Sequence, residues 1–193
     1  MADQPEVPSD VTPDQFFEVM LPMGFEANAA ANPEQTPRAD LTMQYILTGD
    51  GGGDWTMSIK DGKLTSAKGR VESANVTFTV SVDDWRDAVL GQNGASLGLI
   101  LPQPRPGRPD NSGRLKEIKG TMALELSRES KDPYKVEMCF NNAAAPRTLL
   151  KMKLAEWSDM QTGKLNGQEA FMQGRIKVEG DMGFLMQIAM MAM

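Results

Sequence analysis

The side chains that most often carry catalysis are scarce in this chain of 193 residues, which has no histidine and one cysteine, Cys139. Without an imidazole, the sequence excludes histidine-activated serine or cysteine nucleophiles, histidine-containing zinc sites and haem with an axial histidine. The acidic pair Asp83 and Asp84 is typical of a helix start. No nucleophile, base and oxyanion stabiliser can be assembled. We therefore predict a protein that is not an enzyme and that uses no cofactor or metal.

Two weaker candidates for chemistry are an acidic glycine run and the methionines. Asp50 and Asp54 flank three glycines in a run that could hold calcium or phosphate, but no further carboxylate or helix start completes such a site. A hairpin turn is expected there instead. The 15 methionines could bind copper(I), yet they stand at strand or helix spacing among apolar neighbours. Because methionine is unbranched and polarizable, it suits an adaptable apolar surface.

The net charge and the absence of targeting signals limit the partners and the compartment expected for this protein. With 20 Lys and Arg against 26 Asp and Glu, the net charge is −6, which argues against nucleic acid as a partner. The N-terminal segment lacks the pattern of a secretory signal, and no run of about 18 apolar residues could span a bilayer. One cysteine cannot form an intramolecular disulfide, and the chain ends Met-Ala-Met rather than Ser-Lys-Leu. We expect a cytoplasmic protein.

The first predicted secondary-structure element is a helix. Residues 1–12 are predicted to be disordered until Thr12 caps a helix with Pro13 at its first position, and that helix is expected to end near Pro22. Residues 27–40 predict an irregular connection or a short helix. From Leu41 the apolar period becomes two, which predicts a hairpin, a third strand at 76–80 and a helix that Ser81 caps and Gly91 ends.

The same pattern occurs twice. Thr42 and Met43 match Thr121 and Met122 at an offset of 79, and Trp55 matches Tyr134 at the same offset. Trp85 and Gly91 match Trp157 and Gly163 at an offset of 72. One seven-residue deletion between the second and third strands explains the change of offset. We predict two copies of a strand-strand-strand-helix unit, at 41–94 and 120–167, of which the second has Lys153 in place of the capping Ser81.

The proline-rich segment 101–114 is predicted to be an exposed linker between the two copies. The chain is accordingly divided into a disordered N-terminus at 1–12, a first region at 13–100, the linker, and a second region at 115–193. One continuous domain is the alternative.

The C-terminal segment is the most informative one. Asp181 can cap a helix in which Gln187 is the one distinctly polar residue between Met182 and Met193. Such a helix packs inside a core, covers an apolar cavity or forms a subunit interface. Before it, residues 175–180 alternate, so Ile176 and Val178 should point inward and the charged residues toward water.

Residues 163–182, GKLNGQEAFMQGRIKVEGDM, resemble the C-terminal signature of the sterol carrier protein type 2 lipid-transfer family. The signature is a Gly-Lys-Leu turn, an Ala-Phe-Met helix ending in glycine, an alternating strand and a Gly-Asp-Met helix start. The N-terminal helix, the hairpin, Asp61-Gly62 and the segment 76–85 agree more loosely, so the resemblance covers most of residues 13–193. The first copy lacks the Ala-Phe-Met element, which indicates a duplicated or fused relative.

The resemblance implies an α+β fold in which a mainly antiparallel sheet is covered by helices that enclose an apolar tunnel. It implies non-catalytic binding and transfer of a lipid: a fatty acid, an acyl-CoA, a phospholipid or a sterol. A transient membrane contact and a homodimer stay open, and the alternative functions are a protein interaction or dimerisation module and a substrate-presenting subunit of a lipid-modifying enzyme. The expected lipid-binding residues are Trp157, Met160, Phe171, Met172, Ile176, Val178, Met182, Phe184, Leu185, Met186, Ile188 and Ala189.

Overall fold

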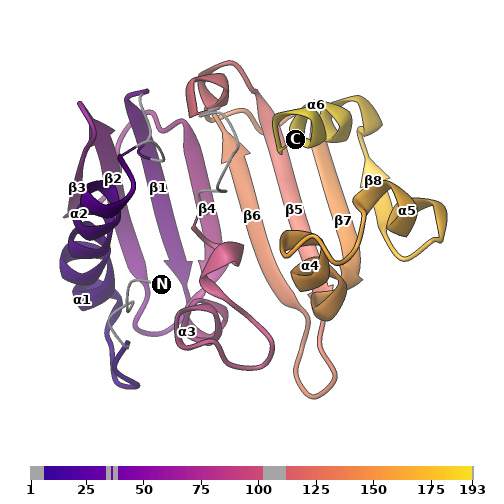
Figure 1. The fold of residues 1–193 in the computed structure, drawn as a ribbon, viewed down its shortest axis with the longest axis horizontal. Helices are drawn as coiled ribbons and strands as arrows, with labels where there is room; N and C mark the ends of the chain where they lie inside the picture. The colour runs from indigo at the N-terminus through magenta and orange to yellow at the C-terminus, as the bar shows by residue number, and fades with distance from the viewer. Residues whose placement is uncertain (1–6, 34–35, 37–38, 102–111, 193) are drawn as a thin grey trace.

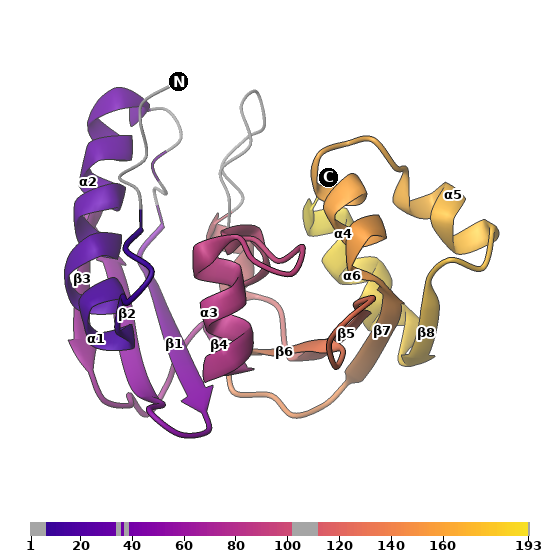
Figure 2. The same ribbon diagram turned by 90° about the horizontal axis from the view of Figure 1, so that it is seen from below.

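Eight strands form one sheet, with helices on one of its faces (Figures 1 and 2). The computed structural model describes residues 7–33, 36, 39–101 and 112–192. The strands, in the order β3-β2-β1-β4-β6-β5-β7-β8, are β1 (Leu41–Thr48), β2 (Gly53–Lys60), β3 (Lys63–Lys68), β4 (Val76–Ser81), β5 (Gly120–Ser127), β6 (Tyr134–Phe140), β7 (Arg147–Lys153) and β8 (Lys177–Gly180). The helices are α1 (Pro13–Gln15), η1 (Phe16–Met20), α2 (Leu21–Ala31), α3 (Val82–Leu90), η3 (Leu97–Leu99), η4 (Ser112–Lys116), α4 (Leu154–Gln161), α5 (Gly167–Met172) and α6 (Met182–Ala192).

The sheet is mixed but mainly antiparallel. Only β1–β4 and β5–β7 pair in parallel among the described strands, and the other neighbours are antiparallel. Alternation places Met43, Tyr45 and Leu47 on the buried face of β1, as the period of two predicts. The predicted α+β class is confirmed.

The repeat is confirmed in the pairing of the strands. Met43 of β1 lies opposite Val76 of β4, and Met122 of β5 lies opposite Thr148 of β7. These partners keep the offsets that the sequence shows, which are 79 between Met43 and Met122 and 72 between Val76 and Thr148. Ser81 accepts the backbone N–H of Asp84 at 3.1 Å and caps α3 as predicted.

The hairpin of the second copy departs from the predicted alignment. Tyr45 pairs with Trp55, whereas Leu124, its counterpart at an offset of 79, pairs with Val136. Val136 therefore occupies the place of Trp55, and the match of Trp55 with Tyr134 is wrong by two residues. The physical reason is a longer turn: residues 127–133 join paired positions in the second copy, where 48–52 do so in the first.

An additional strand, β3, was not predicted. It pairs with β2 across the Asp61-Gly62 turn, whose residues have φ of 50° and 72°. In the second copy, residues 141–146 connect β6 directly to β7, so the deletion removes this strand. The first unit is therefore strand-strand-strand-strand-helix.

The two copies share one sheet because β4 of the first pairs with β6 of the second. In the second copy β8 takes the corresponding place, since it pairs antiparallel with β7 as β6 does with β4.

Most of the predicted linker, 102–111, lies outside the described residues, as do residues 1–6 of the predicted disordered N-terminus. Val11, in the rest of that N-terminal segment, is buried.

The first helix continues past Pro22, contrary to the prediction. Pro22 has no N–H to donate, and it stands in the first turn of α2 directly after the π-helical turn η1. The backbone N–H of Leu21 bonds to Phe16 across that wider turn. A proline at a new helical start costs no hydrogen bond, so the chain stays helical to Ala31.

An aromatic cluster fills the interior of the first copy. Phe17 is fully buried, with its ring centroid 5.0 Å from those of both Trp55 and Tyr45. Phe16 packs edge-on against Trp85 at 5.7 Å. The second copy has aliphatic residues at the corresponding strand positions: Leu124 for Tyr45 and Val136 for Trp55.

Candidate functional site

The predicted lipid-binding residues lie at one end of the sheet, on α4, α5, β8 and α6 and the turn before β8. They fall into three groups by exposure. Ile176, Phe184 and Ile188 are buried in the core; Trp157, Met160, Val178 and Leu185 are half-buried against it; Phe171, Met172, Met182, Met186 and Ala189 are exposed. The structure thus brings the residues to one region but divides them between an inner and an outer surface.

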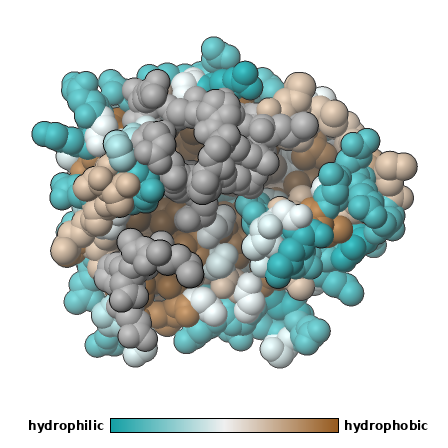
Figure 3. Space-filling model, in the orientation of Figure 1, coloured by the Kyte–Doolittle hydropathy of each residue, from teal (hydrophilic) through white to brown (hydrophobic). Residues whose placement is uncertain are grey.

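Helix α6 is apolar on both sides. Asp181 caps it by accepting the backbone N–H of Phe184 at 2.7 Å, as predicted. Phe184 and Ile188, four residues apart, face the core. On the other side Met182 and Met186 are 44% and 56% exposed. In Figure 3 the surface over α6, at the upper right, is correspondingly apolar.

Met190 belongs to the same outer surface but was not among the predicted residues. It is 59% exposed and continues the spacing of four that begins with Met182 and Met186. That spacing was visible in the sequence and could have identified a methionine stripe. We call Met182, Met186 and Met190 the outer methionine stripe.

Gly120 allows α6 to pack closely on the sheet. A Cβ atom at Gly120 would lie 2.7 Å from Cε2 of Phe184 and 2.6 Å from the carbonyl oxygen of Pro146. The φ of Gly120, +140°, also disfavours any other residue. The absence of a side chain therefore lets the ring of Phe184 approach β5, where it also packs edge-on with Phe140 at 6.3 Å.

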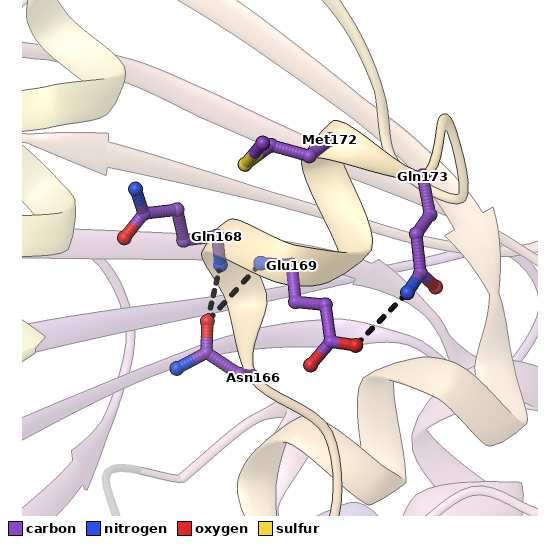
Figure 4. A pocket seen from close by; sticks show the side chains of 5 residues that line it. All are labelled: Asn166, Gln168, Glu169, Met172 and Gln173. Carbon is purple, nitrogen blue, oxygen red and sulfur yellow. Dashed lines mark hydrogen bonds between the residues drawn. The ribbon is translucent and has the colours of Figure 1, made fainter.

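Two hollows on the described surface differ from the predicted tunnel. The first lies on α5 (Figure 4), where Asn166 caps the helix by accepting the backbone N–H groups of Gln168 and Glu169. Its lining residues, Asn166, Gln168, Glu169, Met172 and Gln173, are all exposed. The second lies on the first copy, at Thr12, Pro13, Asp14, Asp50, Gly51, Gly52, Trp55, Lys68, Val82 and Arg86. Neither hollow is enclosed by the apolar residues of the predicted site, so the tunnel stays a prediction.

One ion pair connects α4 to the turn before β8. Nε of Arg175 lies 2.8 Å from Oε1 of Glu156. Burial raises the pKa of Glu156, but hydrogen bonds from Arg175 and from the backbone N–H of Lys153 outweigh it and hold the pKa below its ordinary value. The Lys153 contact is half of a capping box, because lysine has no acceptor to offer in return. Sequence analysis did not identify this pair, whose members are 19 residues apart.

Two further properties of the described residues bear on the site. No helix among them is long and apolar enough to cross a bilayer. No group of three or more Cys, Asp or Glu side chains in this part of the chain is arranged to hold a metal ion.

Comparison with known proteins identifies the family. The family model described as the SCP-2 sterol transfer family matches twice, over residues 25–99 and 101–193. The chain belongs to the SCP-2 sterol transfer family. The two matches correspond to the two copies seen in the sheet, so the predicted resemblance and duplication are confirmed. No curated protein matches the chain.

The solved structures that match the chain are distant in sequence. The sterol carrier protein domain 2 of Helicoverpa armigera is 20% identical, with a TM-score of 0.28, over 94% of this chain and 90% of that one. Apo sterol carrier protein 2 of Yarrowia lipolytica is 12% identical, with a TM-score of 0.21, over 92% and 86%. A double mutant of a Pseudomonas sec-alkyl sulfatase is 15% identical, with a TM-score of 0.33, over 93% of this chain. The chain spans 16% of that sulfatase's length.

Proposed function

We propose that this protein binds a lipid, namely a fatty acid, an acyl-CoA, a phospholipid or a sterol, at the α4–α6 end of the sheet and carries it through water without changing a covalent bond. The observation that carries the proposal is that α6 is apolar on both its inner and its outer side. Burial of an acyl chain or sterol yields about 25 cal/mol per Å², so an apolar and adaptable surface suffices for affinity. Family membership supports the same function.

The second copy is the one proposed to hold the lipid. In the first copy the interior is occupied by aromatic rings of the chain itself, with Phe17 stacked on Trp55. In the second copy the corresponding positions are aliphatic, and the flexible side chain of Met160 on α4 packs against the core. Side chains of this kind can rearrange around a ligand more easily than packed rings.

The first experiment identifies the ligand. Protein purified without added lipid is extracted with organic solvent, and the extract is examined by mass spectrometry for fatty acids, acyl-CoA, phospholipids and sterols. Binding of a fluorescent fatty acid is measured in parallel. A lipid-free extract together with no binding of the fatty acid would overturn the carrier function.

The outer methionine stripe provides a sharper test. Met186→Asp places a charge on an exposed side chain, so the fold should survive while uptake of the fluorescent fatty acid is lost, because charge opposes an apolar ligand. Met23→Asp is the matched control, since Met23 is also exposed, at 64%, but lies on α2. Unchanged uptake by the Met186 variant would contradict the prediction.

Dimerisation through the same stripe is the second candidate, favoured by its exposure in the isolated chain. It predicts that Met186→Asp converts a dimer into a monomer in size-exclusion chromatography with light scattering, with lipid uptake unchanged. A transient contact of the stripe with a membrane predicts instead that the native protein co-sediments with phospholipid vesicles and that the variant does not.

A further inference from the structure

Two ion pairs occupy the same position in the two copies. Asp84 of α3 and Glu156 of α4 differ by 72 residues, the offset that also relates Trp85 and Trp157. Asp84 binds Arg128, and Glu156 binds Arg175, each at 2.8 Å. Arg128 precedes β6 and Arg175 precedes β8, the strands that pair with the last strand of each repeat. Each pair therefore holds the helix of one repeat to the strand that follows it in the sheet.

The inner pair is firmly enclosed. The Arg128 side chain is 4% exposed and binds Asp84 and Asp87 at 2.8 Å each. Its Nε also donates to the carbonyl oxygen of Asp132 at 2.7 Å, and Lys131 adds a second cation at Asp87. The strand that it secures, β6, has seven residues and a neighbour on each side. This end of the repeat is fixed by many simultaneous contacts.

The outer pair is more exposed and has fewer partners. The Arg175 side chain is 38% exposed and pairs with Glu156 alone among the described residues. The strand that it secures, β8, has four residues and pairs with β7 alone. From residue 164 to residue 180 the only buried apolar side chains are Ala170 and Ile176. A segment with few buried contacts and a short edge strand belongs to the part of a protein that opens most easily.

Two glycines, one just before this segment and one within it, have open space around them. Gly163, before α5, and Gly174, before β8, have φ of +76° and +71°, and no atom lies within 4 Å of a Cβ built on either. The far end is anchored, since the backbone N–H of Asp181 donates to the carbonyl oxygen of Arg147 at 2.9 Å. The near end is tied to α4, since the backbone N–H groups of Lys164 and Leu165 donate to the carbonyl oxygen of Asp159 at 2.8 and 3.1 Å. The part of the segment between these two anchors can move away from α4 while α6 stays in place.

We propose that residues 164–180 form a strap that opens at the Glu156–Arg175 pair, and that this opening is the entrance for the lipid. The entrance role rests on the proposed function; the opening itself does not. An open strap would uncover Met160, whose methyl carbon lies 3.3 Å from a Cβ built on Gly167, and Leu150, which pairs with Val178. Both positions adjoin the proposed binding region on α4 and β7.

Hydrogen exchange of the full chain, followed by mass spectrometry, tests the opening. Arg175→Gln should make the amides of 164–180 exchange about two- to fivefold faster, as expected for loss of a partly exposed ion pair. Arg175→Lys should restore much of the protection because the charge is kept. Lys151→Gln is the matched control, since it breaks the pair between Lys151 of β7 and the exposed Glu179 of β8 and leaves the Glu156–Arg175 pair intact. Equal exchange in the wild type and Arg175→Gln, or equal acceleration by the two glutamine variants, would overturn the proposal.

Stopped-flow mixing with a fluorescent fatty acid tests the entrance. Association and dissociation rates should both rise in Arg175→Gln, with a dissociation constant close to that of the wild type, because the pair forms in the free and the bound state. If the wild type binds the fatty acid but neither rate changes, the strap is not the entrance. If the wild type binds no lipid, the proposed function fails, and the exchange measurement still decides whether the strap opens.

Discussion

Individual side chains distinguish the two repeats, and Phe17 does so most clearly. Its ring lies among Tyr45, Trp55 and Trp85, with the centroid of Trp85 at 6.3 Å. The interior of the first copy is therefore filled, around Phe17, by aromatic rings of the chain itself.

Truncation of Phe17 tests its role. Phe17→Ala should lower the free energy of unfolding by about 3–5 kcal/mol, because it leaves a cavity among buried rings. Val19→Ala is the control in the same turn, since Val19 is 52% exposed and should cost no more than about 0.5 kcal/mol. Urea denaturation measures both values. A loss below about 1 kcal/mol for Phe17→Ala would show that the cluster adapts to the missing ring.

At the scale of elements, the close contact between Phe184 of α6 and Gly120 of β5 can be tested. Gly120→Ala would drive a methyl group into the Phe184 ring and the Pro146 carbonyl, so α6 should be displaced from β5. Gly49→Ala is the control, because Gly49 also has a positive φ, +101°, but open space around it. We expect Gly120→Ala to lose about 1–3 kcal/mol more than the control in thermal or urea unfolding. Equal losses would mean that backbone strain alone is measured.

The elements that could be predicted from sequence are those with strong local patterns. The caps Ser81 and Asp181 formed their predicted hydrogen bonds, and the alternation around Ile176 gave the correct inward face. Strand β3 was missed because Leu64 is its one buried residue, so its apolar alternation is weak. The pairing of β4 with β6 could not be predicted from the sequence, because the register between distant strands depends on contacts far apart in the chain.

The lipid-binding role of the twelve predicted residues stays a prediction. They lie in one region of the structure, but the sequence could not separate inward Phe184 from outward Met186, since both are apolar and only two residues apart on α6. The Glu156–Arg175 pair was invisible for a different reason. It depends on how the turn before β8 returns to α4, which no local pattern specifies.

At the scale of the whole molecule, the cluster of Arg128 and Lys131 with Asp84 and Asp87 joins the repeats. Arg128 comes from the second copy, whereas Asp84 and Asp87 come from the first. The sheet alone would connect the copies through β4 and β6, and this cluster also connects helix α3 of the first copy to the turn between β5 and β6 of the second. We therefore expect both repeats to unfold in a single transition.

Arg128→Met tests that connection. The substitution leaves two buried carboxylates without their main partner, so the free energy of unfolding should fall by about 3–5 kcal/mol. Arg70→Met is the control, because the Arg70–Asp54 pair is exposed and should contribute at most about 1 kcal/mol. Circular dichroism during urea unfolding gives both values. A second transition in the wild type would instead show that the repeats unfold independently.

The short strand β8 has a consequence for solubility. While it is paired, it covers the outer edge of β7, and its own edge carries the exposed charges of Lys177 and Glu179, which discourage further strand addition. If β8 separates, the backbone N–H and C=O groups of β7 become a template on which another chain can add a strand, as β6 adds to β4 within this one. Each opening that admits a ligand would then also expose the edge of β7 to other chains for a short time. A chain that opens repeatedly without receiving a ligand would therefore be more prone to self-association and aggregation.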